Sequence, residues 1–121
     1  MSVLDASALL AYLQGEAGAD VVERTLAAGA VCGAANWSEV AQKVQHRSGD
    51  WALARALLLS YRLTVEPVRA VDGERAAQLW SDAAQLSLGD RLCLALAERL
   101  GLPAVTADAA WGESDRIRQI R

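Results

Sequence analysis

An α/β domain built on a parallel sheet is the fold class that this sequence predicts, on three observations. Short apolar runs alternate with longer segments of helical periodicity. Strands that alternate with helices are typical of parallel sheets joined by right-handed crossovers. The length of 121 residues suits one domain, and a hydrophobic share of 53% is ample for its core. We find no internal repeat or linker, so residues 1–121 are expected to fold as one unit.

The expected strands are short and end at polar residues or prolines. The first, residues 2–4, is apolar and is closed by Asp5. A later one, residues 63–66, is closed by Pro67. The others are expected at residues 30–34 and 102–106 and, as a last edge strand, at 116–121.

Helices are expected between these strands. Glycines end the first two, at residues 8–13 and 19–28. The third, from Asn36 to about Arg47, shows the i, i+3, i+4, i+7 spacing of a core face at Trp37, Val40, Ala41 and Val44. The remaining segments are a helix from an Asp72 cap to about Leu86, a helix at 88–100 capped by Ser87, and a short turn or helix at 108–111.

Two further features concern apolar helices. The helix at residues 88–100 is apolar on nearly all faces and is therefore expected to be central. The helix at residues 51–61 carries Leu57, Leu58 and Leu59 in a row and cannot bury every face inside one small domain. We expect this helix to contribute to a homodimer interface.

Four acidic residues stand at junctions between expected strands and helices: Asp5, Glu39, Asp90 and Asp108. In an open α/β sheet, ligands bind beyond the carboxyl ends of the strands. We therefore expect the four carboxylates to share one pocket. Oxygen ligands without histidine or cysteine favour Mg²⁺ or Mn²⁺. Such an ion lowers the pKa of a bound water and clamps a phosphoryl oxygen, which is the chemistry of phosphodiester cleavage.

Each acid also has a local structural explanation. Asp5 and Asp108 can cap the segments that follow them. The spacings Asn36-x-x-Glu39 and Ser87-x-x-Asp90 match a capping box, and Glu39 can also pair with Lys43. The hypothesis of a shared pocket depends on all four acids together, because like charges so placed repel one another unless a cation lies among them.

The segments VLDASALLAYL, NWSEVAQK, LSLGDRLCLALA and VTADAAW resemble, in order, the four acidic motifs of PIN-domain ribonucleases. They most resemble those of the VapC-like toxins of bacterial toxin–antitoxin pairs, and the resemblance spans nearly the whole chain. It implies a parallel sheet of order 3-2-1-4-5 flanked by helices on both faces. It also implies an endoribonuclease that binds Mg²⁺ or Mn²⁺ through Asp5, Glu39, Asp90 and Asp108, a homodimer, and an antitoxin partner.

Two hydroxyl residues, Ser7 and Thr106, match positions where members of that family place a hydroxyl near the metal or its water. A local hydrogen bond to the backbone is an equal alternative for both. Some relatives add an acid after the fourth motif. Glu113 and Asp115 are candidates for that role, and we count neither as a ligand.

The other polar candidates are few. Arg91 directly follows Asp90 and is a candidate contact for an RNA phosphate, with a surface ion pair as the alternative. His46 is the single histidine. Metal-free cleavage through a 2′-hydroxyl usually needs a paired acid and base, so we expect His46 to be a solvated surface residue. Trp111 is expected to cover the core. Further candidate contacts to an RNA backbone are Arg47, Arg116 and Arg118.

The formal net charge of −3 by itself argues against a nucleic-acid partner, but the four proposed site acids account for the excess. Lys43 is the only lysine. Arginine, which binds phosphate or carboxylate through two hydrogen bonds, therefore dominates the cations and suits an RNA or protein partner. Cys32 and Cys93 lie in apolar segments and are expected to be buried thiols in a reducing compartment. No secretory leader or membrane-spanning run is present, so we expect a cytoplasmic location.

Other functions compete with that of a toxin ribonuclease. A phosphatase or phospho-receiver with an acidic Mg²⁺ pocket belongs to a different class, but Ser7 stands where such phosphatases need a second aspartate, and no lysine lies late in the chain as receivers require. A degenerate domain that only binds partners conflicts with the presence of all four acids. A PIN-type nuclease that processes RNA without a toxin role stays open. An upstream reading frame that encodes a DNA-binding antitoxin would distinguish a toxin from an RNA-processing nuclease.

Overall fold

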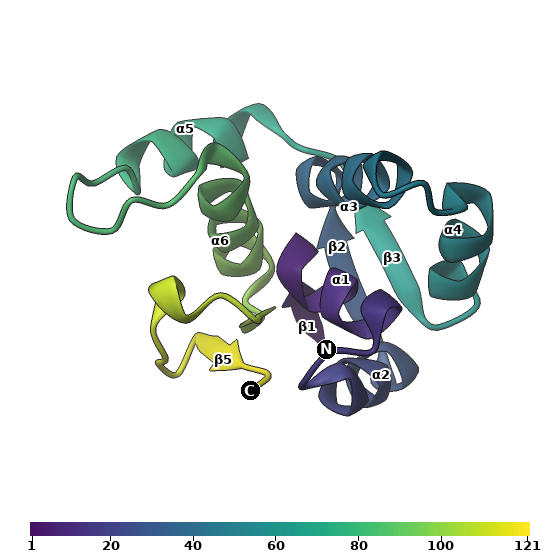
Figure 1. Ribbon diagram of the computed structural model, residues 1–121. Helices are drawn as coiled ribbons and strands as arrows, with labels where there is room; N and C mark the ends of the chain where they lie inside the picture. Colours follow the sequence, from purple (N-terminus) through teal and green to yellow (C-terminus); the bar gives the residue numbers. More distant parts are fainter.

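Five short strands pair in parallel in the order β3-β2-β1-β4-β5 in the computed structural model, which describes residues 1–121 (Figure 1). The strands are β1 (Ser2–Leu4), β2 (Ala30–Gly33), β3 (Leu63–Glu66), β4 (Ala104–Thr106) and β5 (Ile117–Gln119). The helices are α1 (Ala6–Gln14), α2 (Ala19–Ala28), α3 (Ala34–His46), α4 (Trp51–Leu59), α5 (Ala70–Gln78) and α6 (Leu88–Leu100), with a 3-10 turn η1 (Ala109–Trp111). The predicted fold class and strand order are confirmed.

The strands divide the core between the two faces of the sheet, because successive side chains of a strand point to opposite faces. Leu4 and Val105 belong to the apolar cluster that includes α1 and α2. Val3 and Ala104 belong to a second cluster, which includes Leu96 of α6. Helices therefore cover both faces, as the sequence predicts, and α6 is central to one of them.

The α5 helix differs most from the expectation of a helix between Asp72 and Leu86. It begins at Ala70 and ends at Gln78. Asp72 lies inside its first turn and accepts a 3.0 Å hydrogen bond from the N–H of Arg69, so it supports a start three residues earlier than expected. The helix does not extend beyond Gln78, and Trp80, 60% exposed, provides no core contact for a further turn. Ser81 also competes for the backbone there, since its hydroxyl bonds the N–H of Ala83.

Smaller differences occur at the ends of several other elements: α1 spans Ala6–Gln14, β2 ends at Gly33 and β5 spans Ile117–Gln119. Helix α3 begins at Ala34, two residues before the expected Asn36, and its cap is Gly33, whose extended backbone provides no side-chain signal. Strand β4 begins at Ala104, because Pro103 has no N–H for the ladder and offers only its carbonyl, to the N–H of Val3. Helix α4 ends at Leu59.

Three of the eight exposed large apolar side chains lie on α4. Only Leu58 of this helix is buried, whereas Leu53 is 69% exposed and Leu57 and Leu59 are exposed as well. The apolar character of α4 therefore does not reflect burial within one chain. No helix of the structure has the length and hydrophobicity needed to cross a membrane.

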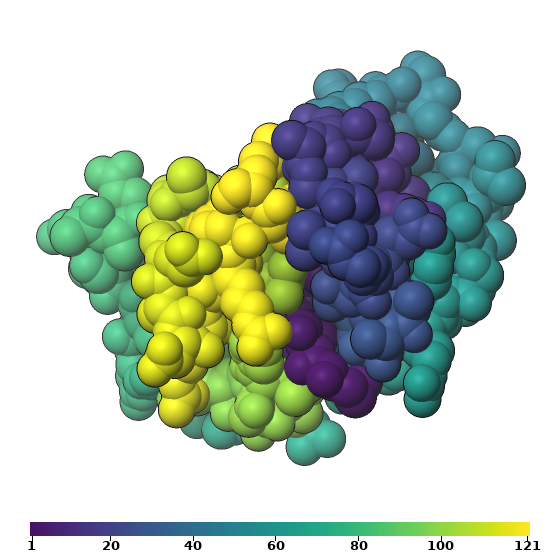
Figure 2. Space-filling view, turned by 90° about the horizontal axis from the view of Figure 1, so that it is seen from below, coloured from purple at the N-terminus to yellow at the C-terminus, as the bar shows by residue number.

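The C-terminal segment beyond β5 packs against the turn that precedes α2, and the N–H of Ile120 bonds the carbonyl of Thr106 at the carboxyl end of β4. Figure 2 shows the C-terminal segment, in yellow, against the blue segment that contains α2. Ile120 fills the contact, and a Cβ at Gly18 would lie 2.7 Å from the Ile120 carbonyl oxygen. Only glycine, here with a φ of +91°, permits this approach.

Candidate active site

The candidate site begins at Asp5, the residue between β1 and α1. Its backbone is extended, and its carboxylate Oδ1 accepts a 2.8 Å hydrogen bond from the N–H of Ala8, which caps α1. The local role predicted as an alternative is therefore real. Capping does not account for the burial, however, since Asp5 is only 3% exposed. Its neighbours on the sheet explain what holds a carboxylate there.

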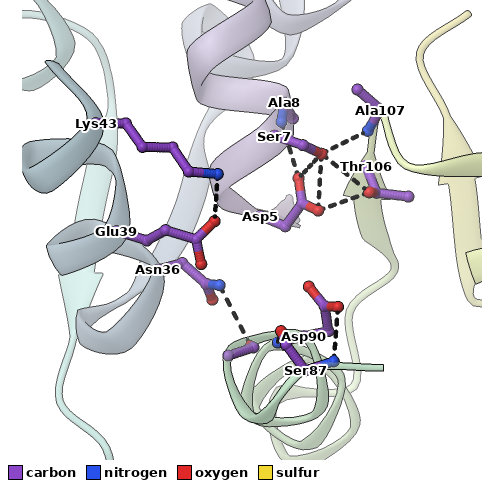
Figure 3. Close-up of polar contacts among 11 residues, drawn as sticks. Asp5, Ser7, Ala8, Asn36, Glu39, Lys43, Ser87, Asp90, Thr106 and Ala107 are labelled. Carbon is purple, nitrogen blue, oxygen red and sulfur yellow. Dashed lines mark hydrogen bonds and ion pairs between the residues drawn. The ribbon is translucent and has the colours of Figure 1, made fainter. Parts of the chain in front are cut away.

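Two hydroxyls hold the carboxylate of Asp5, that of Thr106 from β4 and that of Ser7 from α1. Thr106 donates a 2.6 Å hydrogen bond to Oδ2, and Ser7 lies 2.8 Å and 2.9 Å from the two carboxylate oxygens. Each hydroxyl in turn accepts a backbone N–H: Ser7 from Ala107 at 2.9 Å, and Thr106 from Asp108 at 3.0 Å. These amides orient both hydroxyl protons toward Asp5. Figure 3 shows this network, apart from the bond from Asp108.

Burial raises the pKa of Asp5 to about 6, because desolvation disfavours the charged carboxylate. The hydrogen bonds from Thr106, Ala8 and Ser7 oppose the shift, and the negative charge of Asp90 adds to it. Asp5 and Asp90 are therefore close enough to repel each other. A site of this kind gains from a cation, which would remove both the repulsion and part of the desolvation cost.

Asp90 and Glu39 lie on the first turn of α6 and on α3, across the space in front of Asp5 (Figure 3). Asp90 forms the predicted capping box with Ser87, with hydrogen bonds of 3.0 Å and 3.1 Å. Glu39 does not cap α3 and instead pairs with Lys43 at 3.1 Å. Its other oxygen, Oε1, faces α6. A Cβ added at Gly89 of that helix would lie 3.4 Å from this oxygen.

Asp108 is linked to this arrangement through its backbone. Its carboxylate accepts a 2.9 Å hydrogen bond from the N–H of Ala110 and so caps η1. Its link to Asp5 runs through the backbone, from its own N–H to Thr106. The carbonyl of Asp108 is held by the Gln119 amide at 2.9 Å. The structure thus ties the fourth acidic segment to the first, with the Asp108 carboxylate directed to its own turn.

The fit of these acids to Mg²⁺ or Mn²⁺ depends on how many ligands the ion takes from protein. No three acidic, histidine or cysteine side chains are close enough together to form a complete ligand cage. Mg²⁺ usually keeps several waters and uses one or two carboxylates. Asp5 and Asp90, with Glu39 nearby and no soft ligand among them, suit such a hydrated ion.

Comparison with known proteins identifies the family. The model of the PIN domain matches residues 2–116. The chain belongs to the PIN-domain family. Among solved structures, a toxin–antitoxin complex from Klebsiella pneumoniae has a chain similar to this one, with a TM-score of 0.83, 17% identity, and coverage of 100% of this chain and 98% of the other. The family assignment supports a nuclease, and it confirms the resemblance to PIN-domain proteins noted in the sequence.

A second PIN-like fold comes from Mycobacterium tuberculosis. It is VapC20, a toxin that cleaves the sarcin–ricin loop, with a TM-score of 0.74, 22% identity, and coverage of 95% of this chain and 98% of the toxin. At these identities the two structures establish the VapC-like fold. No curated protein sequence matches the chain significantly.

The remaining predicted residues of this PIN domain lie outside the acidic site. The guanidinium of Arg91 is directed toward α5, where Nη1 donates a 2.8 Å hydrogen bond to the carbonyl of Ala76, so it joins two helices instead of making a surface ion pair. Trp111 is buried as a cover of the core, and both thiols are buried and free. The other candidates, all in exposed positions, are Arg47, Arg116, Arg118, His46, Glu113 and Asp115.

The sequence interpretation missed one residue beside the site. Asn36 was expected to be the cap of α3, but its amide nitrogen donates a 3.3 Å hydrogen bond to the carbonyl of Gly89 on α6. The available signal was its position one helical turn before Glu39, which places both side chains on the same face of α3.

Proposed function

We propose that this PIN domain is an endoribonuclease that depends on a divalent cation, Mg²⁺ or Mn²⁺, and that it is the toxin of a toxin–antitoxin pair. The observation that carries the proposal is the buried carboxylate of Asp5, fixed by two hydroxyls beside the charge of Asp90. A structural N-cap needs neither this burial nor a second acid nearby. The family assignment argues against the phosphatase and receiver alternatives.

The residues would divide the work as follows. Asp5, Asp90 and Glu39 would hold the cation, with Asp108 linked to them through its backbone, and Ser7 and Thr106 would orient the carboxylate of Asp5. When bound, the cation would activate a water for attack on phosphorus and stabilise charge on the phosphoryl oxygens. The hydroxyl contacts fix Asp5 before any ligand arrives, so little reorganisation is needed on binding.

Product analysis tests this chemistry. An RNA oligonucleotide cleaved in Mg²⁺ should give 5′-phosphate and 3′-hydroxyl ends by mass spectrometry, because the proposed site has four acids and the chain has a single histidine. A 2′,3′-cyclic phosphate among the cleavage products would contradict this mechanism. Asp5→Asn should abolish cleavage. The matched control is Asp20→Asn, an exposed acid on α2 paired with Arg24, which should leave cleavage unchanged.

The toxin role and the antitoxin partner rest on likeness to the two toxin structures. An antitoxin should dock near the acidic pocket and offer an arginine to the carboxylates in place of the cation. Induced expression of the protein should arrest the growth of a bacterial host. Co-expression of the antitoxin encoded beside it should restore that growth. Cleavage without arrest would favour an RNA-processing nuclease without a toxin role. Folding without cleavage of any RNA would favour a domain that only binds partners.

The homodimer is proposed on the exposed face of α4. Leu53 and Leu57 line a groove of about 330 Å³ together with Leu13 of α1 and Val44 of α3. Exposed apolar side chains gathered along one helix are typical of protein interfaces. A second copy that packed its own α4 here would bury both faces at once, as isologous dimers do.

A further inference from the structure

Asn36 is a buried polar side chain whose hydrogen bonds within the chain satisfy only part of it. It lies in the first turn of α3 and is 2% exposed. Its amide nitrogen bonds the carbonyl of Gly89, while its oxygen Oδ1 has no partner. A buried, partly satisfied amide is less favourable for folding than an apolar side chain of similar size. Stability alone therefore does not explain an asparagine at this position.

The Asn36 side chain lies between the two helices that bring acids to the site. Its 3.3 Å bond to Gly89 is the only hydrogen bond that joins α3 to α6. Gly89 immediately precedes Asp90, and a Cβ added at Gly89 would lie 3.8 Å from Nδ2 of Asn36 and 3.4 Å from Oε1 of Glu39. The first turns of the two helices are thus in close contact at this point (Figure 3).

We propose that Asn36 is a positioning residue of the acidic site. By holding the Gly89 carbonyl, it fixes the first turn of α6 against α3, and so sets the distance of Asp90 from Glu39 and Asp5. This inference rests on the proposed function, because the spacing of the three carboxylates matters for a shared hydrated cation. The capping box orients Asp90 within α6, and Asn36 orients the start of α6 within the fold.

The test compares Asn36→Leu, which replaces the amide with two methyl groups on the same branched frame, with Val40→Ala as a matched control. Val40 is a fully buried α3 residue, so its truncation destabilises the core without touching the link to α6. Asn36→Ser is a second variant should the leucine not fold. Two quantities are measured: Mn²⁺ affinity by calorimetry, with the metal alone, and hydrogen exchange of the Asp90 and Arg91 amides, both of which bond Ser87.

We expect Asn36→Leu to weaken Mn²⁺ binding about 10- to 100-fold, the usual effect of losing a residue that orients a metal ligand. Exchange at the Asp90 and Arg91 amides should also be faster, without metal, than in the wild type. The Val40→Ala control should lower the melting midpoint and leave Mn²⁺ affinity within twofold. Wild-type exchange and affinity in Asn36→Leu would overturn the inference. A wild-type protein that binds no Mn²⁺ would overturn the proposed function, while the exchange data would still decide whether Asn36 holds α6.

Discussion

Thr106 donates a 2.6 Å hydrogen bond to Asp5 although 101 positions separate the two residues in the chain. The contact exists because β1 and β4 are neighbours at the point where the strand order reverses. Ligand sites in open α/β sheets form at such switch points. The bond thus joins the first and last acidic segments in one polar network.

The free energy of unfolding should depend on the ionisation of Asp5. Its pKa is raised to about 6 in the folded chain, above the unfolded value of about 3.9. The neutral form is therefore favoured by folding, and its contribution is fully present below about pH 4 and lost as the pH rises through 6. In EDTA, Asp5→Asn should gain stability relative to the wild type over this range, by about 3 kcal/mol at most.

Urea denaturation of both proteins at pH values between 4 and 8 checks this prediction. Asp20→Asn serves as the control, because Asp20 is exposed and its ion pair with Arg24 is on the surface. A stability difference between Asp5→Asn and wild type that stays constant with pH would show that Asp5 ionises normally in the folded state.

Asp90 has a structural role and a proposed metal-binding role that two substitutions separate. Ser87→Ala removes the cap hydrogen bond and should cost about 1 kcal/mol. Asp90→Ala removes the other half of the capping box but also relieves repulsion with Asp5, so without metal it should cost less than Ser87→Ala. Wild type should gain roughly 2.7 kcal/mol at free Mg²⁺ a hundred times the dissociation constant.

Thermal melts with EDTA and with Mg²⁺ measure both effects. Ser87→Ala should keep the Mg²⁺-induced rise in melting midpoint and retain RNA cleavage, whereas Asp90→Ala should lose most of both. An equal rise in midpoint for Asp90→Ala and wild type would remove Asp90 from the metal site.

The sequence predicts the sheet well because its strands end at residues that cannot continue them. Asp5 and Pro67 mark such ends, and periodic apolar residues mark the helices between. The extent of α5 could not be predicted, because Asp72 is fixed by Arg99, 27 positions away, with hydrogen bonds of 2.7 Å and 3.1 Å. The start of α3 at Ala34 could not be predicted either, because its cap, Gly33, has no side chain that could form a capping hydrogen bond.

The candidate site follows the same division. The capping box of Ser87 and Asp90 is local and was predicted from spacing alone. The role of Asn36 depends on Gly89, 53 positions later, and no local pattern reveals that contact. The sequence predicted one pocket for all four acids, and it did not indicate that Asp108 would direct its carboxylate to its own turn.

The ion pair of Asp72 and Arg99 should be the main polar link between α5 and α6. Asp72 is 3% exposed, and Arg99 holds the pKa of its carboxyl below the usual range. Arg99→Ala should cost about 3–5 kcal/mol because it leaves a buried charge unpaired. Arg75→Ala is the control, since its pair with Glu98 is exposed and should contribute under about 1 kcal/mol. Chemical denaturation at pH 7 measures both, and equal losses would contradict the burial argument.

Gly18 and Gly15 form a matched pair for testing how the C-terminus is held. Both have positive φ, but a Cβ at Gly15 meets nothing within 4 Å, whereas one at Gly18 lies 2.7 Å from the backbone oxygen of Ile120. Gly15→Ala should cost about 1 kcal/mol from backbone strain alone. Gly18→Ala should cost clearly more and should speed hydrogen exchange of the Ile120 amide, which bonds Thr106. Similar losses for the two substitutions would show that the C-terminal contact contributes little to stability.

Leu53 on α4 provides the sharpest test of the proposed homodimer. Its side chain is 69% exposed, so Leu53→Glu should leave the stability of a monomer nearly unchanged. The backbone N–H of Leu53 bonds the carboxylate of Asp50, and this cap survives the substitution. In a dimer packed through this face, each introduced carboxylate would be buried at the interface, and the dissociation constant should rise at least about tenfold, that is, by about 1.4 kcal/mol. The control is Trp80→Glu, a residue of similar exposure in the loop after α5. Light scattering at tens of micromolar should give a dimer for wild type and Trp80→Glu and a monomer for Leu53→Glu. A monomeric wild type, or a Leu53→Glu variant as dimeric as wild type, would rule out an interface on this face.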